Sequence, residues 1–460
     1  MTSGLPSLKE ATARGRALRE QSPRSSLGKL AARPEDYDAV ARLIWQGQSR
    51  IGELLPLRYS RMLASPLAFY RGTALLMAED LVRGPSTSLE VQISGDAHLS
   101  NFNLFSSPER RLVFDVDDFD ETDVGPFEWD VKRLVASLAL ASAYLGHSPA
   151  QQEKAAVVAA REYRLSMRSL AAQTRLSVWY ASLDVNAVVS DLRGYFTDNA
   201  LRRVDQVVHL AQRSSTHDHL RKVITYVGGS PRINSSPPLL VPLPELGGDP
   251  YLERAQIDEI IHGYGRTLSS DRRVLLSQFS VVDAARKVVG VGSVGSECYA
   301  ILLVGRDERD PFLLQVKQAT TSVVATARGI TPDVADGERV VAGQRLMQAS
   351  SDVFLGWYSL EGSANPRSFY VRQLYDDKGA IDIDRLDEKL LLTYGRLCAW
   401  VLARAHARSG GAAQIAGYLG KSDVADQALA AFAVAYQERT RADFAALGRA
   451  RDDGRITVSG

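Results

Sequence analysis

Two short segments of the chain carry acidic and amide side chains immediately after apolar runs. Residues 89–93 are followed by Asp96 and Asn101, and residues 112–116 run into a dense group of carboxylates. Carboxylates this close together repel one another, so a bound cation is their natural compensation. An acid and an amide after one strand, with more carboxylates after the next, suit a Mg²⁺–phosphate site better than a solvated acidic loop.

The spacing within these segments assigns a different role to each residue. Asp96 and Asn101 are five positions apart, which lets one loop aim a base at a hydroxyl group and an amide at a metal ion. We therefore predict Asp96 as the general base. The predicted metal ligands are Asn101, Asp118 and Asp120. We expect His98 to brace the first loop rather than to exchange protons itself.

A glycine-rich segment, GVGSVG at 290–295, lies between two predicted strands, and Lys317 follows in the next strand. A dinucleotide-binding fold would place such a segment between a strand and a helix. This context instead favours a hairpin over nucleotide phosphates with a lysine beneath it, as opposed to an ordinary turn with a surface lysine. The predicted nucleotide contacts are Gly290, Gly292, Ser293, Gly295, Lys317 and Glu338, with Glu338 as the partner of the lysine. The predicted catalytic residues are Asp96, Asn101 and Lys317.

The composition is that of an ordinary globular protein. The 460 residues are 45% hydrophobic and 24% charged, with a formal net charge of +1, which argues against a surface that coats nucleic acid or membranes. The chain has two cysteines, Cys298 and Cys398, and they form no metal-binding or C-x-x-C spacing, which suits a reducing cytosol. Because there is no apolar run of membrane-spanning length and no secretory signal, we predict a cytoplasmic protein.

Hydrophobic periodicity predicts an α+β protein with a large helical part and a smaller part made of antiparallel strands. Helices are expected at 36–81, 130–146, 150–172, 196–213, 251–267, 337–348 and beyond 384. Strands are expected at 89–93, 112–116, 281–290, 297–304, 312–319 and 368–376. The helix at 130–146 is apolar almost all round and is therefore predicted to be buried.

These elements predict five parts along the chain. Residues 1–49 are expected to form a flexible N-terminal arm, and residues 50–227 a helical lobe with the catalytic and metal loops. Residues 228–249, rich in Gly, Pro and Ser, are predicted to be a linker. Residues 250–383 would form the nucleotide-binding small lobe, and residues 384–460 would return to complete the helical lobe.

The first acidic loop, GDAHLSN at 95–101, resembles the H-G-D-x-H-x-x-N loop of aminoglycoside phosphotransferases and related small-molecule kinases. Ser94 stands where those enzymes usually have histidine. The Asp118-Phe119-Asp120 segment is similar to their metal-binding motif, and Trp129-Asp130 is similar to their W-D-L motif, which carries a buried aspartate. The resemblance implies ATP and Mg²⁺ (or Mn²⁺) as cofactors.

The full set of motifs, over roughly residues 50–445, resembles a large bacterial family known only as a domain of unknown function. The kinship of this family with kinases is an inference, and it implies a kinase-like fold of two lobes. In ordinary kinases the glycine-rich loop and lysine precede the catalytic aspartate. Here Gly290 and Lys317 come long after Asp96, so the expected fold is a circularly permuted one.

The sequence therefore predicts an ATP- and Mg²⁺-dependent transferase that moves phosphate to a hydroxyl group of a small-molecule or protein acceptor. A nucleotide-binding pseudoenzyme or scaffold and an AMP transferase remain as alternatives. The acidic run DDFDE also resembles the diphosphate-binding motif of prenyl-transferring enzymes, but that motif lies on a helix, whereas the residues before this run predict a strand. His406 lies on an apolar helix and is predicted to be structural. Neither the acceptor nor the oligomeric state can be predicted from these motifs.

Overall fold

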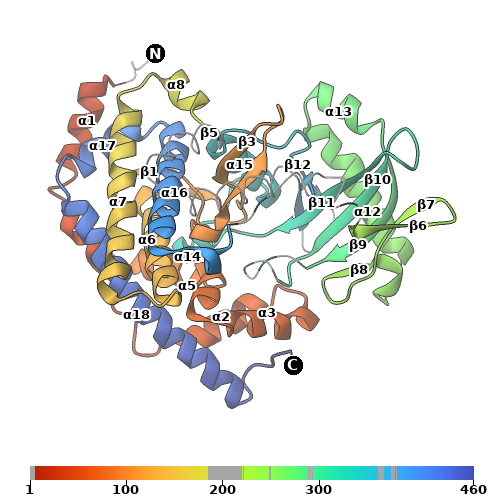
Figure 1. Cartoon of the computed structure of the whole chain (residues 1–460), viewed down its shortest axis with the longest axis horizontal. Helices are drawn as coiled ribbons and strands as arrows, with labels where there is room; N and C mark the ends of the chain where they lie inside the picture. The colour runs from red at the N-terminus through yellow and green to blue at the C-terminus, as the bar shows by residue number, and fades with distance from the viewer. Residues whose placement is uncertain are drawn as a thin grey trace.

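The computed structural model describes residues 6–184, 220, 222–247, 250–288, 290, 292, 294–360, 367–374, 379 and 381–459. It is a mixed α+β structure in which helices gather on one side and the largest sheet lies on the other (Figure 1). The predicted α+β class and antiparallel strands are thereby confirmed. None of the helices in these residues is long and apolar enough to cross a membrane.

The helical part is built around α6 (Phe127–Tyr144), which is buried along nearly its whole length, as the sequence predicts. Three longer helices enclose it: α7 (Pro149–Ala171), α16 (Glu388–Arg408) and α18 (Val424–Asp452). Apolar residues on all sides of α6 pack against these neighbours to form the largest core of the protein. Two short helices complete this part, α8 (Arg175–Tyr180) and α17 (Ala412–Leu419).

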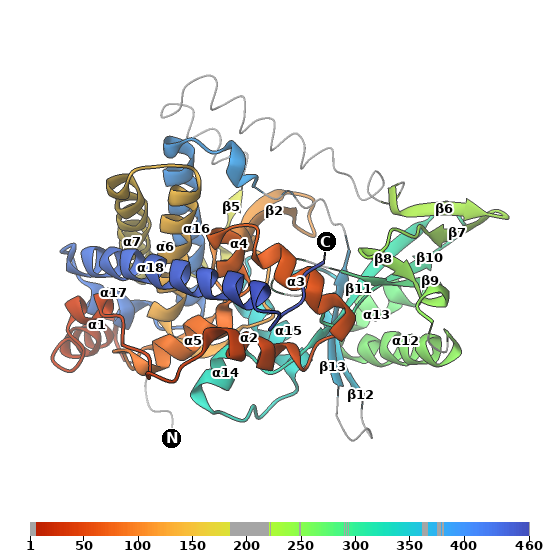
Figure 2. The same ribbon diagram turned by 90° about the horizontal axis from the view of Figure 1, so that it is seen from below.

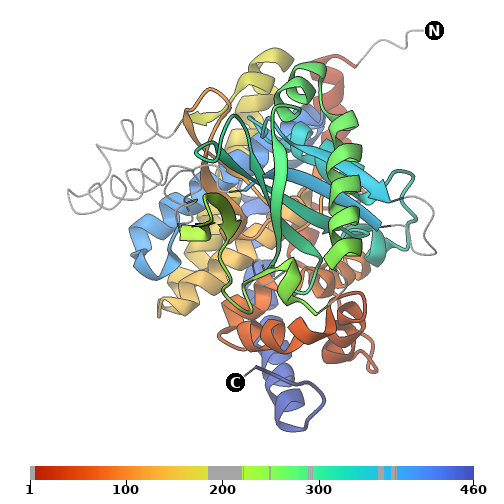
Figure 3. The same ribbon diagram turned by 90° about the vertical axis from the view of Figure 1, so that its right-hand side faces the viewer.

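The largest sheet has six antiparallel strands in the order β12-β13-β11-β10-β9-β8. Their bounds are β8 Leu240–Pro242, β9 Ser280–Lys287, β10 Cys298–Val304, β11 Pro311–Ala319, β12 Gly356–Leu360 and β13 Arg367–Gln373. Helix α12 (Pro250–Tyr264) and the shorter α13 (Ser270–Leu276) pack on one face over a separate apolar core, and Figure 3 looks onto this side of the molecule. The glycine-rich segment connects β9 to β10, and Lys317 lies near the end of β11.

Two small sheets and one helix join these parts. Strand β1 (Glu90–Ile93) pairs with β4 (Asp123–Pro126), and β3 (Leu112–Val116) lies between β2 (Phe102–Ser106) and β5 (Leu183–Asp184). Helix α15 (Asp336–Met347) packs against β12 and β13 on one side and against β1 and α16 on the other. Both acidic loops therefore lie where the helical part meets the six-stranded sheet.

The N-terminal segment differs from the flexible arm predicted for residues 1–49. Its described residues form α1 (Leu8–Ala17) and α2 (Ala39–Gly47), and Leu27 between them is 1% exposed. Helix α1 packs against α17, and residues around Leu27 pack against α18. The Ser, Arg and Pro content suggested disorder, but apolar residues such as Leu27 and Leu43 bury themselves against helices from the far end of the chain.

The segment 228–249, predicted to be a linker, contains regular secondary structure in the residues that the structure describes. This stretch contains β7 (Ser230–Ile233), paired with β6 (Ile224–Val227), and β8 at the edge of the six-stranded sheet. An edge strand needs hydrogen bonds on one side only, which makes it compatible with the prolines of this segment. The helix predicted at 196–213 lies outside the described residues.

Four more helices complete the described structure, three after the N-terminal segment and one that packs against α5. They are α3 (Leu55–Met62), α4 (Pro66–Arg71), α5 (Ala74–Arg83) and, after β11, α14 (Val323–Arg328). Viewed from below, α3 lies close to the C-terminus (Figure 2). The Ser459 amide donates to the Pro56 carbonyl at 3.2 Å, so the C-terminal end of the described chain lies against α3.

Candidate functional site

The first acidic loop follows β1 and turns sharply at Gly95. This glycine has φ +76°, and a Cβ atom there would lie 2.1 Å from the main-chain oxygen of Glu121 in the second acidic loop. Only glycine allows both the left-handed conformation and this close approach. The two acidic loops, separate in sequence, therefore touch at the point where the first one begins.

Asp130, in the first turn of α6, holds the start of this loop. Its carboxylate accepts hydrogen bonds from the main-chain amides of Ser94 at 2.6 Å and Gly95 at 2.9 Å. His406 Nε2 lies 3.1 Å from the same carboxylate, and His406 Nδ1 lies 2.7 Å from the hydroxyl of Tyr163. Asp130 and His406 are fully buried, and they connect the acidic loop to α7 and α16 as structural supports.

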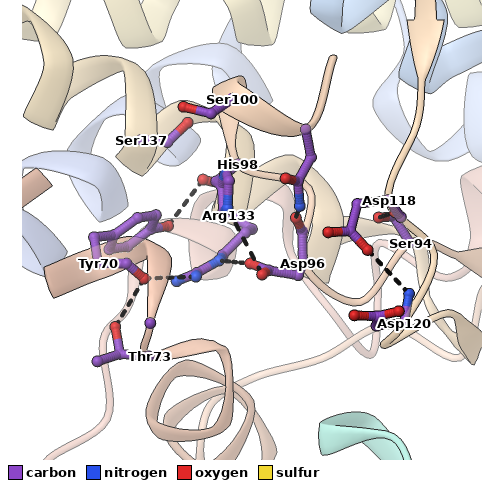
Figure 4. A network of polar contacts seen from close by, with 12 residues as sticks. Tyr70, Thr73, Ser94, Asp96, His98, Ser100, Asp118, Asp120, Arg133 and Ser137 are labelled. Atoms are coloured by element: carbon purple, nitrogen blue, oxygen red, sulfur yellow. Dashed lines mark hydrogen bonds and ion pairs between the residues drawn. The ribbon is translucent and has the colours of Figure 1, made fainter. Parts of the chain in front are cut away.

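Asp96 faces Arg133 of α6, whose Nε donates to it at 2.8 Å (Figure 4). Arg133 also donates to the Tyr70 carbonyl at 2.7 Å and stacks over the Tyr70 ring, so its position is fixed. Burial raises the pKa of Asp96 to about 7, against the opposing effect of Arg133. A carboxylate with this pKa can accept and release a proton near neutral pH.

Asn101 and His98 both lie close to Asp96. The Asn101 side-chain amide donates its N–H to the Asp96 carbonyl at 2.9 Å, which leaves its oxygen as the end able to ligate a cation. His98 Nε2 lies 3.7 Å from the Asp96 carboxylate, and its Nδ1 has no partner. Burial lowers the pKa of His98 well below its usual value, so the imidazole is neutral beside Asp96.

The second acidic loop follows β3 and presents Asp118 and Asp120 to the same space (Figure 4). Burial, followed by the neighbouring Asp120 carboxylate, raises the pKa of Asp118, while Lys317 opposes this shift. Asp115, from the predicted run of carboxylates, lies elsewhere because it pairs with the buried Arg404. The carboxylates of this run therefore do not all face the site: Asp118 and Asp120 line the cavity, whereas Asp115 is buried in the core.

Lys317 and Asp120 form an ion pair across the interface between the sheet and the second loop. The Tyr370 hydroxyl donates to the other carboxylate oxygen of Asp120 at 2.7 Å, and Tyr370 lies opposite Lys317 in the pairing of β11 with β13. Burial acts to raise the pKa of Asp120, but Lys317 overrides it, so the pKa falls below its usual value. Asp120 is therefore an ionised carboxylate.

Glu338 is not the partner of Lys317, contrary to the prediction, because Asp120 takes that place. The next residue of α15, Arg339, reaches the site instead. Its guanidinium donates to the carbonyls of Asp120 at 3.0 Å and Thr320 at 2.8 Å, and also to that of Thr122. Successive helix residues point about 100° apart, so the side chain that faces the loop is the arginine. Helix α15 therefore holds the second loop by hydrogen bonds from Arg339 to main-chain carbonyls of that loop.

The glycine-rich segment lies against the N-terminal helices. Gly295 has φ +89°, its carbonyl accepts from the Ile51 amide at 2.7 Å, and Arg50 Nη1 donates to the Val294 carbonyl at 2.7 Å. A Cβ at Gly292 would lie 3.3 Å from the Arg71 carbonyl. Of the predicted nucleotide contacts in this segment, Ser293 lies outside the described residues.

A cavity of about 190 Å³ brings most of the predicted residues together. The predicted residues that line it are Asp96, Asn101, Asp118, Asp120, Gly290, Gly292 and Lys317. Gly295 and Glu338 do not line it. In the described part of the chain, no group of three or more His, Cys, Asp or Glu side chains is arranged to hold a metal ion. Asp118 and Asn101 fit a Mg²⁺ ion only if phosphate or water oxygens supply its remaining ligands, as in many nucleotide sites.

Sequence reasoning predicted Lys317 but did not assign the arginines of the site. The cavity is also lined by Arg50, Arg58, Arg71 and Arg372. Arg372 lies on β13 and donates to the Asp117 carbonyl at 2.9 Å. The other three come from the N-terminal helices, which no motif connects to the acidic loops. Arg71 and Arg133 were visible in the sequence as arginines within or beside apolar helices, where a buried charge needs a partner.

The model of a family described as an uncharacterized protein conserved in bacteria (DUF2252) matches residues 50–450. The match confirms the family resemblance predicted from the motifs, and it carries no link to kinases. No curated protein and no solved structure matches the chain. Function must therefore be inferred from the geometry of the site.

Proposed function

This chain belongs to that bacterial family, and we propose that it is an ATP- and Mg²⁺-dependent phosphotransferase acting on a hydroxyl group. One observation carries the proposal: Asp96, Asn101, Asp118 and Lys317, from three separate segments, line a single cavity beside the glycine-rich segment. Phosphoryl transfer needs little covalent chemistry from a protein, but it needs a base, a metal ligand set and cations placed around the phosphates. These residue types supply each part.

Asp96 is the proposed general base. In the reaction the acceptor oxygen bonds to the γ-phosphorus of ATP, the bond from that phosphorus to the bridging oxygen of ADP breaks, and the hydroxyl proton moves to Asp96. A pKa of about 7 favours this role, because the carboxylate is ionised in a useful fraction of molecules at neutral pH yet holds a proton readily. Arg133 positions the carboxylate.

Asp118 and the Asn101 amide oxygen would hold Mg²⁺, which when bound neutralises charge on the phosphates. Lys317 would contact the phosphates as a point charge. Its ion pair with Asp120 keeps both groups charged and in place. The main chain of Gly290 and Gly292 would approach the phosphates closely, since these residues have no side chains to prevent it.

The kinase-like fold expected from the motifs is part of the same proposal. The six-stranded sheet carries Lys317 and the glycine-rich segment, while the helical part carries both acidic loops. This distribution of the site residues over two parts is typical of kinases. The order along the chain is reversed relative to kinases. We therefore propose a circularly permuted kinase-like arrangement, with α16, α17 and α18 returning to the helical part.

A nucleotide-binding protein without turnover is the second candidate. It is favoured by one observation, the ion pair of Asp96 with Arg133, because a base that is held by a guanidinium group is less available to a hydroxyl group. In this case ATP would bind with Mg²⁺ but would not be consumed.

Nucleotide binding and turnover by the full-length chain test both candidates. Calorimetry should detect ATP binding that requires Mg²⁺ or Mn²⁺, and Asp118→Asn should abolish it. Asp117→Asn is the matched control, because Asp117 is the adjacent carboxylate but does not line the cavity. Slow release of ADP would support phosphate transfer, release of pyrophosphate would indicate AMP transfer, and binding without release would favour the second candidate. Absence of ATP binding by the wild-type protein would reject the proposal.

A further inference from the structure

Three arginines from the N-terminal part of the chain line the cavity. Arg50 precedes α3, Arg58 lies on α3 and Arg71 is the last residue of α4. We call them the arginine wall. In the part of the chain that the structure describes, none of the three forms an ion pair with a carboxylate. The proposed phosphotransferase chemistry does not use them.

Two arginines of the wall, Arg58 and Arg71, have buried donors without a hydrogen-bond partner among the described residues. Arg58 is 1% exposed, and although its Nη2 donates to Gln46 and to the Gly72 carbonyl, its buried Nε and Nη1 have no partner. The buried Nε of Arg71 also has no partner. A buried cationic donor without an acceptor is costly, because it loses its hydration and gains nothing in exchange.

Three other buried arginines differ in having a carboxylate partner, although Nε and Nη1 of Arg404 also lack a hydrogen-bond partner. Arg133 pairs with Asp96, Arg164 with Asp426, and Arg404 with Asp115. These pairs follow the general rule that a buried charge is compensated by an opposite charge. The three arginines of the wall have no such carboxylate partner among the described residues, and all three line the cavity. The missing counter-charge is therefore expected from a ligand in that cavity.

The position of Arg71 indicates which ligand this is. Arg71 lines the same cavity as Asp96 and His98. Burial lowers the pKa of Arg71, and the carboxylate of Asp96 is the strongest influence in the opposite direction. Burial lowers the pKa of His98, which lies beside Asp96, and the positive charge of Arg71 lowers it further. Lys317, by contrast, lies with Asp120 on the side assigned to the nucleotide. A molecule in this cavity that offers its hydroxyl group to Asp96 can therefore place an anionic group against Arg71.

We propose that the arginine wall binds an oxyanion on the acceptor, so that the acceptor is a hydroxyl compound already carrying a phosphate group. Guanidinium groups suit this task because their planar N–H donors match the oxygens of phosphate in pairs. This inference rests on the proposed function, since only a transferase has an acceptor. It narrows the substrate class from any alcohol to phosphorylated ones.

Inorganic phosphate is the probe for the test, titrated by calorimetry into the full-length chain without nucleotide or Mg²⁺. The wild-type protein should bind phosphate, and Arg71→Gln should weaken this binding roughly 10- to 100-fold, the range for losing one or two charge-assisted hydrogen bonds. Arg71→Lys, which keeps the charge, should lose less. Arg61→Gln on α3 is the matched control, because Arg61 does not line the cavity and should leave phosphate binding unchanged.

Binding of Mg²⁺-ATP separates the acceptor site from the nucleotide site. Arg71→Gln should keep the wild-type affinity for Mg²⁺-ATP, whereas Asp118→Asn should lose it and keep phosphate binding. No phosphate binding by the folded wild-type protein would overturn the inference, as would an equal loss of phosphate and Mg²⁺-ATP binding in Arg71→Gln. Wild-type protein that binds phosphate but not Mg²⁺-ATP would reject the phosphotransferase, and the acceptor assignment with it. Arg71 is only half-buried, so this variant is less prone to misfold than Arg58→Gln.

Discussion

The two acidic loops each place a buried carboxylate beside a cation, yet the two carboxylates behave in opposite ways. Asp96 of the first loop pairs with Arg133, and its pKa rises to about 7. Asp120 of the second loop pairs with Lys317, and its pKa falls below the usual value. Burial alone would raise the pKa of both groups. The difference lies in the other contacts of each group.

Asp120 receives more stabilisation of its charged form. The Tyr370 hydroxyl donates to it, and Arg372 lies close enough to favour ionisation further. Among the described residues, Asp96 forms an ion pair with one arginine, Arg133, and the nearby carboxylates of Glu121 and Asp118 disfavour its charge. A site can therefore hold one carboxylate permanently ionised and leave another able to titrate, although both face the same cavity. This is the pattern expected for a fixed electrostatic element and a proton acceptor.

Removing the cation of the second loop should have the largest effect. Lys317→Met leaves the Asp120 carboxylate without its ion-pair partner, and breaking a buried pair from one side costs about 3–5 kcal/mol of unfolding free energy. The loss should be at the lower end, because the Asp120 side chain is 24% exposed. Mg²⁺-ATP binding should also disappear. Chemical denaturation and calorimetry measure the two effects.

The double variant Lys317→Met/Asp120→Asn is the control for this prediction. Removing both charges should restore most of the lost stability, because no uncompensated carboxylate remains. It should not restore nucleotide binding. If Lys317→Met bound Mg²⁺-ATP as tightly as the wild type, the lysine would have no part in the nucleotide site.

Removing the carboxylate of the first loop should affect turnover and leave nucleotide binding intact. Asp96→Asn keeps the shape of the side chain and a hydrogen-bond acceptor but loses the basic oxygen. Transfer should fall roughly 10²- to 10⁴-fold, the usual range for loss of a general base. Because the acceptor is unidentified, slow ATP hydrolysis is a second readout of the same step. Wild-type turnover in this variant at saturating Mg²⁺ would show that Asp96 is not the base.

The titration of Asp96 should appear in the pH dependence of turnover. Since the base must be ionised, the rate should rise through an apparent pKa of about 7 and level off above it. Asp96→Asn should lack this limb. A wild-type profile that is flat between about pH 6 and 8 would contradict the assignment.

The same titration has a smaller effect on stability, with a defined sign. The pKa of Asp96 is raised from 3.8, so between about pH 4 and 7 the folded protein keeps a proton that the unfolded chain releases. The contribution of Asp96 to stability is thus complete below about pH 4 and is lost as the pH rises through 7. Denaturation at several pH values should show the wild type losing stability relative to Asp96→Asn over this window.

Features of this site that depend on neighbouring residues in the sequence could be predicted, whereas contacts between distant segments could not. The residues of the two loops follow from local signals: apolar runs that end in Asp96, Asn101 and Asp118, and the glycine that the first turn requires. The strands that carry Lys317 and the glycine-rich segment follow from β-branched and apolar patterning. These signals do not depend on the rest of the fold.

The partners of these residues could not be predicted in the same way. Arg58 and Arg71 reach the cavity through the packing of short N-terminal helices, and no spacing in the sequence encodes that approach. The N-terminal segment was predicted to be flexible for the same reason, because its buried residues contact α17 and α18 from the opposite end of the chain. Contacts between segments so far apart are decided by tertiary packing, which local composition does not report.

Substitution of Glu338 is expected to have the smallest effect, and it tests whether the kinase analogy or the structure identifies the partner of Lys317. A kinase analogy assigns it to Lys317, whereas in this structure Lys317 pairs with Asp120 and the adjacent Arg339 contacts the second loop. Glu338→Gln should therefore change the unfolding free energy by no more than about 0.5 kcal/mol, as for a substitution outside any network. It should leave Mg²⁺-ATP binding and turnover at wild-type levels.

Arg339→Gln is the contrasting variant, because it removes the donor to three carbonyls and should weaken nucleotide binding by displacing the second loop. A fall of more than tenfold in turnover for Glu338→Gln would mean that nucleotide binding brings the glutamate to the lysine, and that the ion pair of Lys317 with Asp120 exists only in the nucleotide-free protein.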